Sequence, residues 1–106
     1  MEERRRGARY AFYASAQITE QESQTQMTAR TSELSRYGCY MDMLNPLPLG
    51  TEVEIQITFQ EQIIAAKGRV IYAQPNMGMG VSFDEIRSSH VAILEAWLDQ
   101  ALKQQA

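Results

Sequence analysis

Residues 51–83 read TEVEIQITFQEQIIAAKGRVIYAQPNMGMGVSF, and apolar and polar side chains alternate through most of this stretch. Because successive side chains of a β-strand point to opposite faces of the sheet, a period of two is typical of strands with one buried and one wet face. Turn-forming segments at 60–62 and 73–76 interrupt the alternation. The pattern therefore predicts three consecutive strands, over residues 51–59, 63–72 and 77–83.

Weaker alternation upstream predicts three more strands, over residues 10–19, 25–31 and 38–44. Six short strands at close spacing favour a small barrel, because closure of the sheet removes exposed strand edges. After Asp84 the apolar residues recur every three or four positions up to Leu102, which predicts one amphipathic helix. We therefore expect an all-β fold, a six-stranded antiparallel β-barrel with one C-terminal α-helix. Trp97, beside the apolar stripe of this helix, is expected to cover one end of the barrel.

The chain has 106 residues, of which 44% are hydrophobic and 22% are charged. This size and composition are typical of one globular domain, and no repeat or low-complexity segment divides the chain. We expect a single domain over residues 1–106, with a flexible arginine-rich arm at 1–9, the barrel at 10–84 and the helix at 85–104. No apolar stretch approaches the length of a signal sequence or a membrane span, so we expect a cytoplasmic protein without membrane insertion.

Candidate catalytic and metal-binding residues are few. Cys39 is the only cysteine and His90 the only histidine, so the sequence holds neither an intrachain disulfide nor a Cys/His cluster for zinc. Both residues are expected to be structural, because Cys39 belongs to a predicted strand and His90 borders the apolar stripe of the helix. Most of the 13 carboxylates fall on outward strand positions, in turns or in the arm. We therefore expect no enzyme activity, no catalytic residue and no metal site.

Basic charge is concentrated at the N-terminus. Residues 1–9 hold four arginines and two glutamates, whereas residues 10–106 hold six basic and eleven acidic side chains. Arginine presents a planar fork of donors that suits phosphates and guanine edges. Taken alone, such an arm is also typical of a charged tail that aids solubility. A second segment changes this interpretation: residues 33–38 read ELSRYG and form a turn between two predicted strands.

The order of these segments resembles the PilZ domain family. Arg5 and Arg9 are spaced as Arg-x-x-x-Arg before the first predicted strand, and Glu33, Ser35 and Gly38 are spaced as Glu-x-Ser-x-x-Gly between the second and third. In PilZ domains an Arg-x-x-x-Arg motif and an Asp/Asn-x-Ser-x-x-Gly motif bind the bacterial second messenger cyclic di-GMP on a six-stranded barrel. The resemblance covers residues 4 to about 103. It implies a cyclic di-GMP site, with no further cofactor, made of Arg4, Arg5, Arg9, Glu33, Ser35 and Gly38.

Glu33 departs from the family pattern, which has Asp or Asn at this position. Its carboxylate keeps the charge but lies one methylene farther from the backbone, which displaces its contact with a ligand. The chemistry still fits, because arginine can bind the O6/N7 edge of guanine with two hydrogen bonds and a carboxylate can accept from guanine N1 and N2. The resemblance thus implies a stand-alone receptor or adaptor that binds cyclic di-GMP and signals by contact with an effector protein.

Two other functions are compatible with the sequence. One is a protein-interaction module on the same barrel that binds no cyclic di-GMP, because some family members lack competent motifs and Glu33 is an exception to the pattern. The other is a barrel that binds single-stranded nucleic acid, which would place basic and aromatic residues on one sheet face. The strand at 51–59 places Glu52, Glu54 and Gln56 there instead. The sequence therefore favours the nucleotide receptor, without a DNA or RNA partner.

Overall fold

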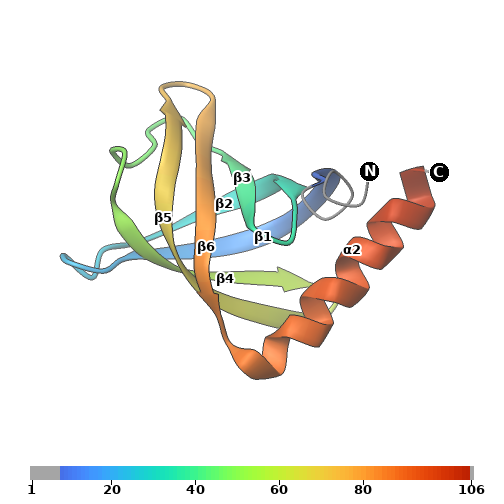
Figure 1. Ribbon diagram of the computed structural model, residues 1–106. Coiled ribbons are helices and arrows are strands. Elements are labelled where there is room, and N and C mark those ends of the chain that lie inside the picture. The colour runs from blue at the N-terminus through green and yellow to red at the C-terminus, as the bar shows by residue number, and fades with distance from the viewer. Residues whose placement is uncertain (1–7, 106) are drawn as a thin grey trace.

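Residues 8–105 are described by the computed structural model, in which six antiparallel strands form a closed barrel with a helix across one end (Figure 1). The order around the barrel is β1-β2-β3-β6-β5-β4, and β4 pairs with β1 to close it. This confirms the predicted six-stranded barrel with a C-terminal helix. The elements are β1 (Tyr10–Glu20), β2 (Gln26–Leu34), β3 (Gly38–Asp42), β4 (Glu52–Phe59), β5 (Gln62–Gln74), β6 (Gly78–Ile86), the short 3-10 helix η1 (Ser88–His90) and α2 (Val91–Gln105).

The core consists of the inward-facing side chains of all six strands. We expect six apolar residues of the alternating stretch at 51–83 to be core; Phe83 is only partly buried at the edge of the core, and five are fully buried: Val53, Ile55, Ile57, Val70 and Val81. Glu52 and Glu54 are exposed, as the alternation predicts. A slip of one residue would turn every side chain of a strand to the opposite face, so burial of this apolar set specifies the register.

Trp97 of α2 closes one end of the barrel. Its side chain is 2% exposed, stacks on Phe12 with ring centroids 5.4 Å apart and meets Phe59 edge-on at 5.7 Å. The indole N–H donates to Oε1 of Gln62 at 3.3 Å, so burial of the ring leaves no unpaired donor. Leu94 and Ala101, which lie one helical turn away on either side, are also buried. The predicted role of Trp97 is confirmed.

Three element boundaries differ by three residues or more from the sequence-based ones, and several other strand ends differ by one or two. The expected second strand ended at residue 31, but β2 continues to Leu34 because its last residues pair with β3. The expected helix began at residue 85, but β6 continues to Ile86 because its last residues pair with β5 beyond a bulge. The helix proper then begins at Val91, after η1. Pairing with a distant strand thus extends β2 and β6 beyond their local patterns.

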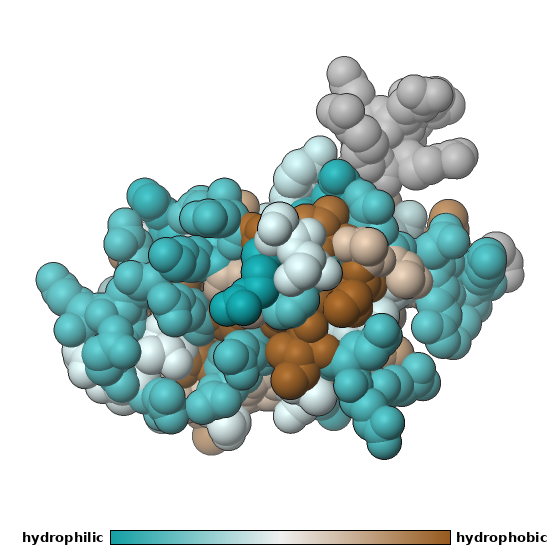
Figure 2. Space-filling view, turned by 90° about the horizontal axis from the view of Figure 1, so that it is seen from below, coloured by the Kyte–Doolittle hydropathy of each residue, from teal (hydrophilic) through white to brown (hydrophobic). Residues whose placement is uncertain are grey.

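The face of the molecule seen from below is mainly hydrophilic at its periphery. Figure 2 shows hydrophilic side chains around a central hydrophobic area on this face. This agrees with the alternation in β4, whose outward positions are Glu52, Glu54 and Gln56. Within residues 8–105, no helix combines the length and the apolar character needed to span a membrane.

Candidate functional site

A groove of about 700 Å³ lies over the outer face of β3, β5 and β6 and reaches the end of β2. The sequence of β6 explains the hollow, because Met79 and Val81 face the core while Gly80 and Ser82 occupy the outward positions. A strand with only small outward side chains forms a low floor between its neighbours. The turn between β2 and β3 and the segment before β1 border this floor.

One cross-strand row spans the groove. Glu33 of β2 pairs with Tyr40 of β3, Tyr40 pairs with Gly80 of β6, and Gly80 pairs with Tyr72 of β5. Adjacent strands lie about 4.8 Å apart, so three such steps place the two ends of the row about 14 Å from each other. The groove therefore has the Glu33 carboxylate at one end and the Tyr72 ring at the other, with Tyr40 and then Gly80 between them.

Arg9 and Glu33 meet at the β2 end of the groove. Arg9 directly precedes β1, and the pairing of Ala11 with Glu33 brings the two side chains together. Nε of Arg9 lies 3.7 Å from Oε1 of Glu33, and the two side chains are 70% and 45% exposed. Exposed ion pairs contribute at most about 1 kcal/mol, so both groups can exchange this contact for a ligand at small cost. Two residues that the sequence motifs singled out separately thus form one charged rim.

Ser35 shapes the turn between β2 and β3. Its buried hydroxyl accepts the backbone N–H groups of Tyr37 and Gly38, both at 3.1 Å, and donates to the carbonyl oxygen of Gly38 at 3.3 Å. The Ser35 N–H donates to the same carbonyl at 2.9 Å. One donated and two accepted hydrogen bonds use the full hydrogen-bonding capacity of the Ser35 hydroxyl. Ser35 therefore affects the groove by fixing the shape of the turn.

Gly38 is needed because β3 and β6 approach each other closely. It pairs with Ser82, and a Cβ at this position would lie 2.3 Å from the carbonyl oxygen of Val81. Ser35 and Gly38 both line the groove. The structure therefore brings together Arg9, Glu33, Ser35 and Gly38. Arg4 and Arg5 of the predicted site, with most of the predicted arm, lie outside the described residues 8–105.

The sequence motifs did not indicate the two tyrosines of the groove. Tyr40 and Tyr72 line it, and their ring centroids are 6.1 Å apart. Partial burial raises the pKa of Tyr40, with smaller contributions from Tyr72, Asp42 and Glu33, so its hydroxyl keeps its proton at neutral pH. The available signal was the outward Gly-x-Gly-x-Ser pattern of β6. This pattern alone does not predict a groove, because the side chains that flank the small residues depend on the register with the neighbouring strands.

Cys39 and His90 have structural roles, as expected. Cys39 is buried in β3, and burial raises the pKa of its thiol to about 12. Nδ1 of His90 accepts the backbone N–H of Ala65 at 2.9 Å. Among the described residues, no group of three or more His, Cys, Asp or Glu side chains could hold a metal ion.

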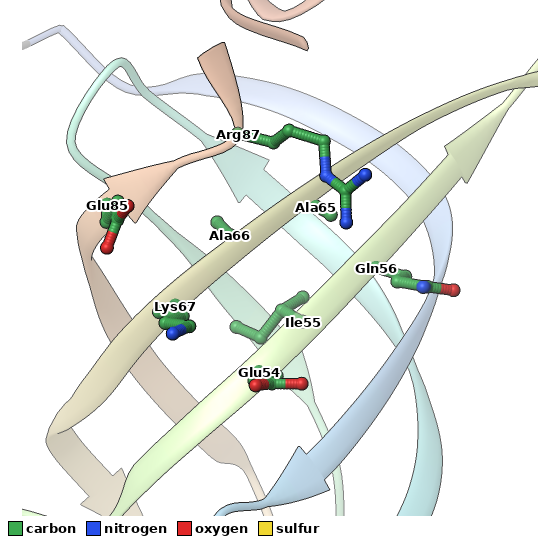
Figure 3. Close-up of a pocket in the computed structure, with 8 residues that line it drawn as sticks. All are labelled: Glu54, Ile55, Gln56, Ala65, Ala66, Lys67, Glu85 and Arg87. Carbon is green, nitrogen blue, oxygen red and sulfur yellow. The ribbon is translucent and has the colours of Figure 1, made fainter. Parts of the chain in front are cut away.

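A second hollow, of about 280 Å³, lies on the outer face of β4 and β5 (Figure 3). It forms where the small side chain of Ala65 is flanked by longer ones, and Arg87 extends across it. Glu54, Lys67 and Glu85 make one cross-strand row beside it, so its charges alternate and compensate each other. None of the motif residues lines this hollow. The groove over β6 is therefore the stronger candidate.

Comparison with known proteins agrees with this fold. The PilZ domain family model matches residues 3–100. Among solved structures, the PilZ domain of CeSA from a cellulose-synthesizing bacterium has a TM-score of 0.67 and 16% identity, covering 93% of this chain and 99% of that one. The Bacillus subtilis inhibitor of motility MotI/DgrA has a TM-score of 0.75 and 17% identity, covering 97% of this chain and 54% of that one.

At these identities the two structures show a shared fold, and the family assignment rests on the sequence match. A comparison with curated protein sequences gave no match. The family match extends from the arginine-rich segment to the helix that carries Trp97, and it confirms the resemblance found in the motifs. The chain therefore belongs to the PilZ domain family, a family of binding domains that act as cyclic di-GMP receptors.

Proposed function

We propose that this chain binds cyclic di-GMP in the groove over β3, β5 and β6 and passes the signal on by contact with an effector protein. In this proposal Arg4, Arg5 and Arg9 supply guanidinium groups, and Glu33 with the turn of Ser35 and Gly38 forms the facing side. The observation that carries the proposal is the position of Arg9 beside Glu33, at the rim of a groove that the Ser35–Gly38 turn also lines.

The chemistry of the rim suits this ligand. Cyclic di-GMP carries two phosphate charges and two guanine bases, and a guanidinium can bind a phosphate or the O6/N7 edge of guanine through paired hydrogen bonds. The Glu33 carboxylate is an acceptor for the N1–H and N2–H donors of the same base. Arg9 and Glu33 face each other in an exposed ion pair, so a guanine that bonds to both replaces one weak contact with several hydrogen bonds.

Titration calorimetry with cyclic di-GMP tests the proposal, with GTP as the control ligand. Arg9→Ala is the diagnostic variant, and Arg30→Ala is its matched control. Arg30 also forms an exposed ion pair, with Asp42 at 3.0 Å, but it does not line the groove. We expect wild type to bind cyclic di-GMP and not GTP, Arg9→Ala to bind roughly 5- to 150-fold more weakly, and Arg30→Ala to match wild type. Equal affinities for the two variants would place the site elsewhere.

The second candidate is a protein-interaction module that binds no nucleotide. Two observations favour it: Glu33 stands where the family has Asp or Asn, and the Ser35 hydroxyl is fully engaged within its own turn. This candidate predicts that folded wild type shows no heat of binding at high micromolar cyclic di-GMP. In that case a gain of binding in Glu33→Asp would identify a lapsed nucleotide site.

A further inference from the structure

Tyr40 and Tyr72 form an aromatic surface that extends across the groove from β3 to its β5 end. They lie on strands β3 and β5, on either side of Gly80 of β6, and their rings are tilted by 44° with centroids 6.1 Å apart. Gly80 places no side chain between the two rings. A Cβ there would make ordinary contacts, 3.5 Å from Cβ of Tyr72 and 3.8 Å from Cδ1 of Tyr40.

Each ring has one contact beside the groove. The Tyr72 hydroxyl donates to Oε1 of Gln74 at 2.6 Å. Tyr40 lies across β6, with its Cε2 atom 2.9 Å from the point where a Cβ of Gly78 would be. Tyr72 is nonetheless 50% exposed, so its ring is accessible from the groove. An accessible tyrosine surface can bind a flat partner with little loss of side-chain entropy, because tyrosine has only two χ angles to restrict.

The two ends of the groove differ in chemistry. Among the described residues that line it, only Arg9 and Glu33 are charged, and both lie at the β2 end. Tyr40 is the cross-strand neighbour of Glu33, whereas Tyr72 lies at the β5 end, which is bordered by Ile71 and Met77, both more than half exposed. Charged groups read the hydrogen-bonding edge of a base, whereas aromatic and apolar side chains contact its face.

We propose that Tyr40 and Tyr72 form a stacking subsite for the second base of the bound cyclic dinucleotide, while Arg9 and Glu33 read the edge of the first. This inference rests on the proposed function and adds a specificity to it. Stacking accepts any base, because every base has a π-face. Adenine lacks the N1–H and N2–H donors that a carboxylate requires, so only the β2 end demands guanine. The site should therefore accept cyclic GMP-AMP and reject cyclic di-AMP.

Calorimetric titrations with cyclic di-GMP, cyclic GMP-AMP and cyclic di-AMP test this specificity on wild type. We expect cyclic GMP-AMP to bind within about tenfold of cyclic di-GMP, because one guanine still reaches Glu33 and the adenine stacks. Cyclic di-AMP is expected to bind at least about 100-fold more weakly, because no base then satisfies the carboxylate. Equal rejection of cyclic GMP-AMP and cyclic di-AMP would show that both bases are read by their edges and would overturn the inference.

Variants of Tyr72 test the stacking contact itself. Tyr72→Leu removes the ring but keeps an apolar side chain, and we expect it to weaken cyclic di-GMP binding by roughly 5- to 150-fold. Tyr72→Phe keeps the ring and is expected to bind like wild type. Tyr13→Leu is the matched control, because Tyr13 is 59% exposed on β1 and lies outside the groove. Thermal melts of each variant verify that the barrel is intact.

A nuclear magnetic resonance signal separates stacking from a merely structural role of the ring. The H8 proton of a stacked purine shifts upfield on binding, and this shift should be present in wild type and Tyr72→Phe and absent in Tyr72→Leu. Unchanged affinity of Tyr72→Leu, with Arg9→Ala still weakened, would overturn the stacking subsite and leave the proposed function standing. Folded wild type that binds no cyclic dinucleotide would overturn the proposed function and the subsite together.

Discussion

Gly38 stands where β3 passes close to β6, and its replacement by alanine tests why the turn motif ends in glycine. The added Cβ would lie 2.3 Å from the carbonyl oxygen of Val81 and 3.2 Å from Cα of Ser82. Both atoms belong to the backbone of β6, so no side chain can rotate away to make room. The two strands must separate locally, and overpacking of this kind costs about 1–3 kcal/mol of folding free energy.

The expected change in melting temperature follows from the size of the chain. With an unfolding entropy of about 2.1 cal/mol/K per residue, the 106 residues give about 0.22 kcal/mol/K, so Gly38→Ala should melt about 4–13 °C below wild type. Gly80→Ala is the matched control on the neighbouring strand, because its Cβ would meet nothing closer than 3.5 Å. Its melting temperature should stay unchanged or rise by up to about 4 °C, since alanine restricts the unfolded chain.

Thermal unfolding followed by circular dichroism measures both variants, and urea unfolding at 25 °C checks the ranking. If the melting temperatures of Gly38→Ala and Gly80→Ala were both at or above that of wild type, the close approach of β3 and β6 would not explain why residue 38 is a glycine. A direct role in ligand contact would then be the remaining reason for Gly38.

Three further predictions concern the rim, the core and the pH dependence of stability. Glu33→Asp should bind cyclic di-GMP as well as wild type or up to about tenfold better in calorimetry, because the shorter carboxylate loses less side-chain entropy on binding; weaker binding would contradict this. Trp97→Ala should lower the free energy of unfolding in urea by about 3–5 kcal/mol, because the buried indole contacts both Phe12 and Phe59; a loss below about 1 kcal/mol would show that α2 does not seal the core. Burial raises the pKa of the Cys39 thiol from 9.0 to about 12, so above pH 9 the unfolded chain loses a proton that the folded protein keeps. Stability should therefore fall between about pH 9 and pH 12 by up to about 1.4 kcal/mol per pH unit, and Cys39→Ala, measured by urea unfolding at several pH values, should lack this part of the slope.

The strands were predictable because their signal is local. Val53, Ile55 and Ile57 alternate with polar residues, and the pleat of a β-strand turns this alternation into one buried and one exposed face wherever the strand pairs. The helix was predictable in the same way from its period. Its start was not, because Glu85 and Ile86 continue β6 through pairing with β5, a contact that depends on residues far away in the sequence.

For the candidate site, the sequence by itself determined which motif residues are present and in which order, because a motif consists of residue types at short, fixed spacings along the chain. It could not indicate that Arg9 lies beside Glu33, since that contact depends on the register between β1 and β2. Gly38 appeared in the sequence as a turn residue, yet the atom that requires it belongs to Val81 on another strand. The same reason applies to the tyrosine pair. Tyr40, Gly80 and Tyr72 become one row only when β3, β6 and β5 pair, because side chains on different strands become neighbours through hydrogen-bonded register and not through sequence spacing.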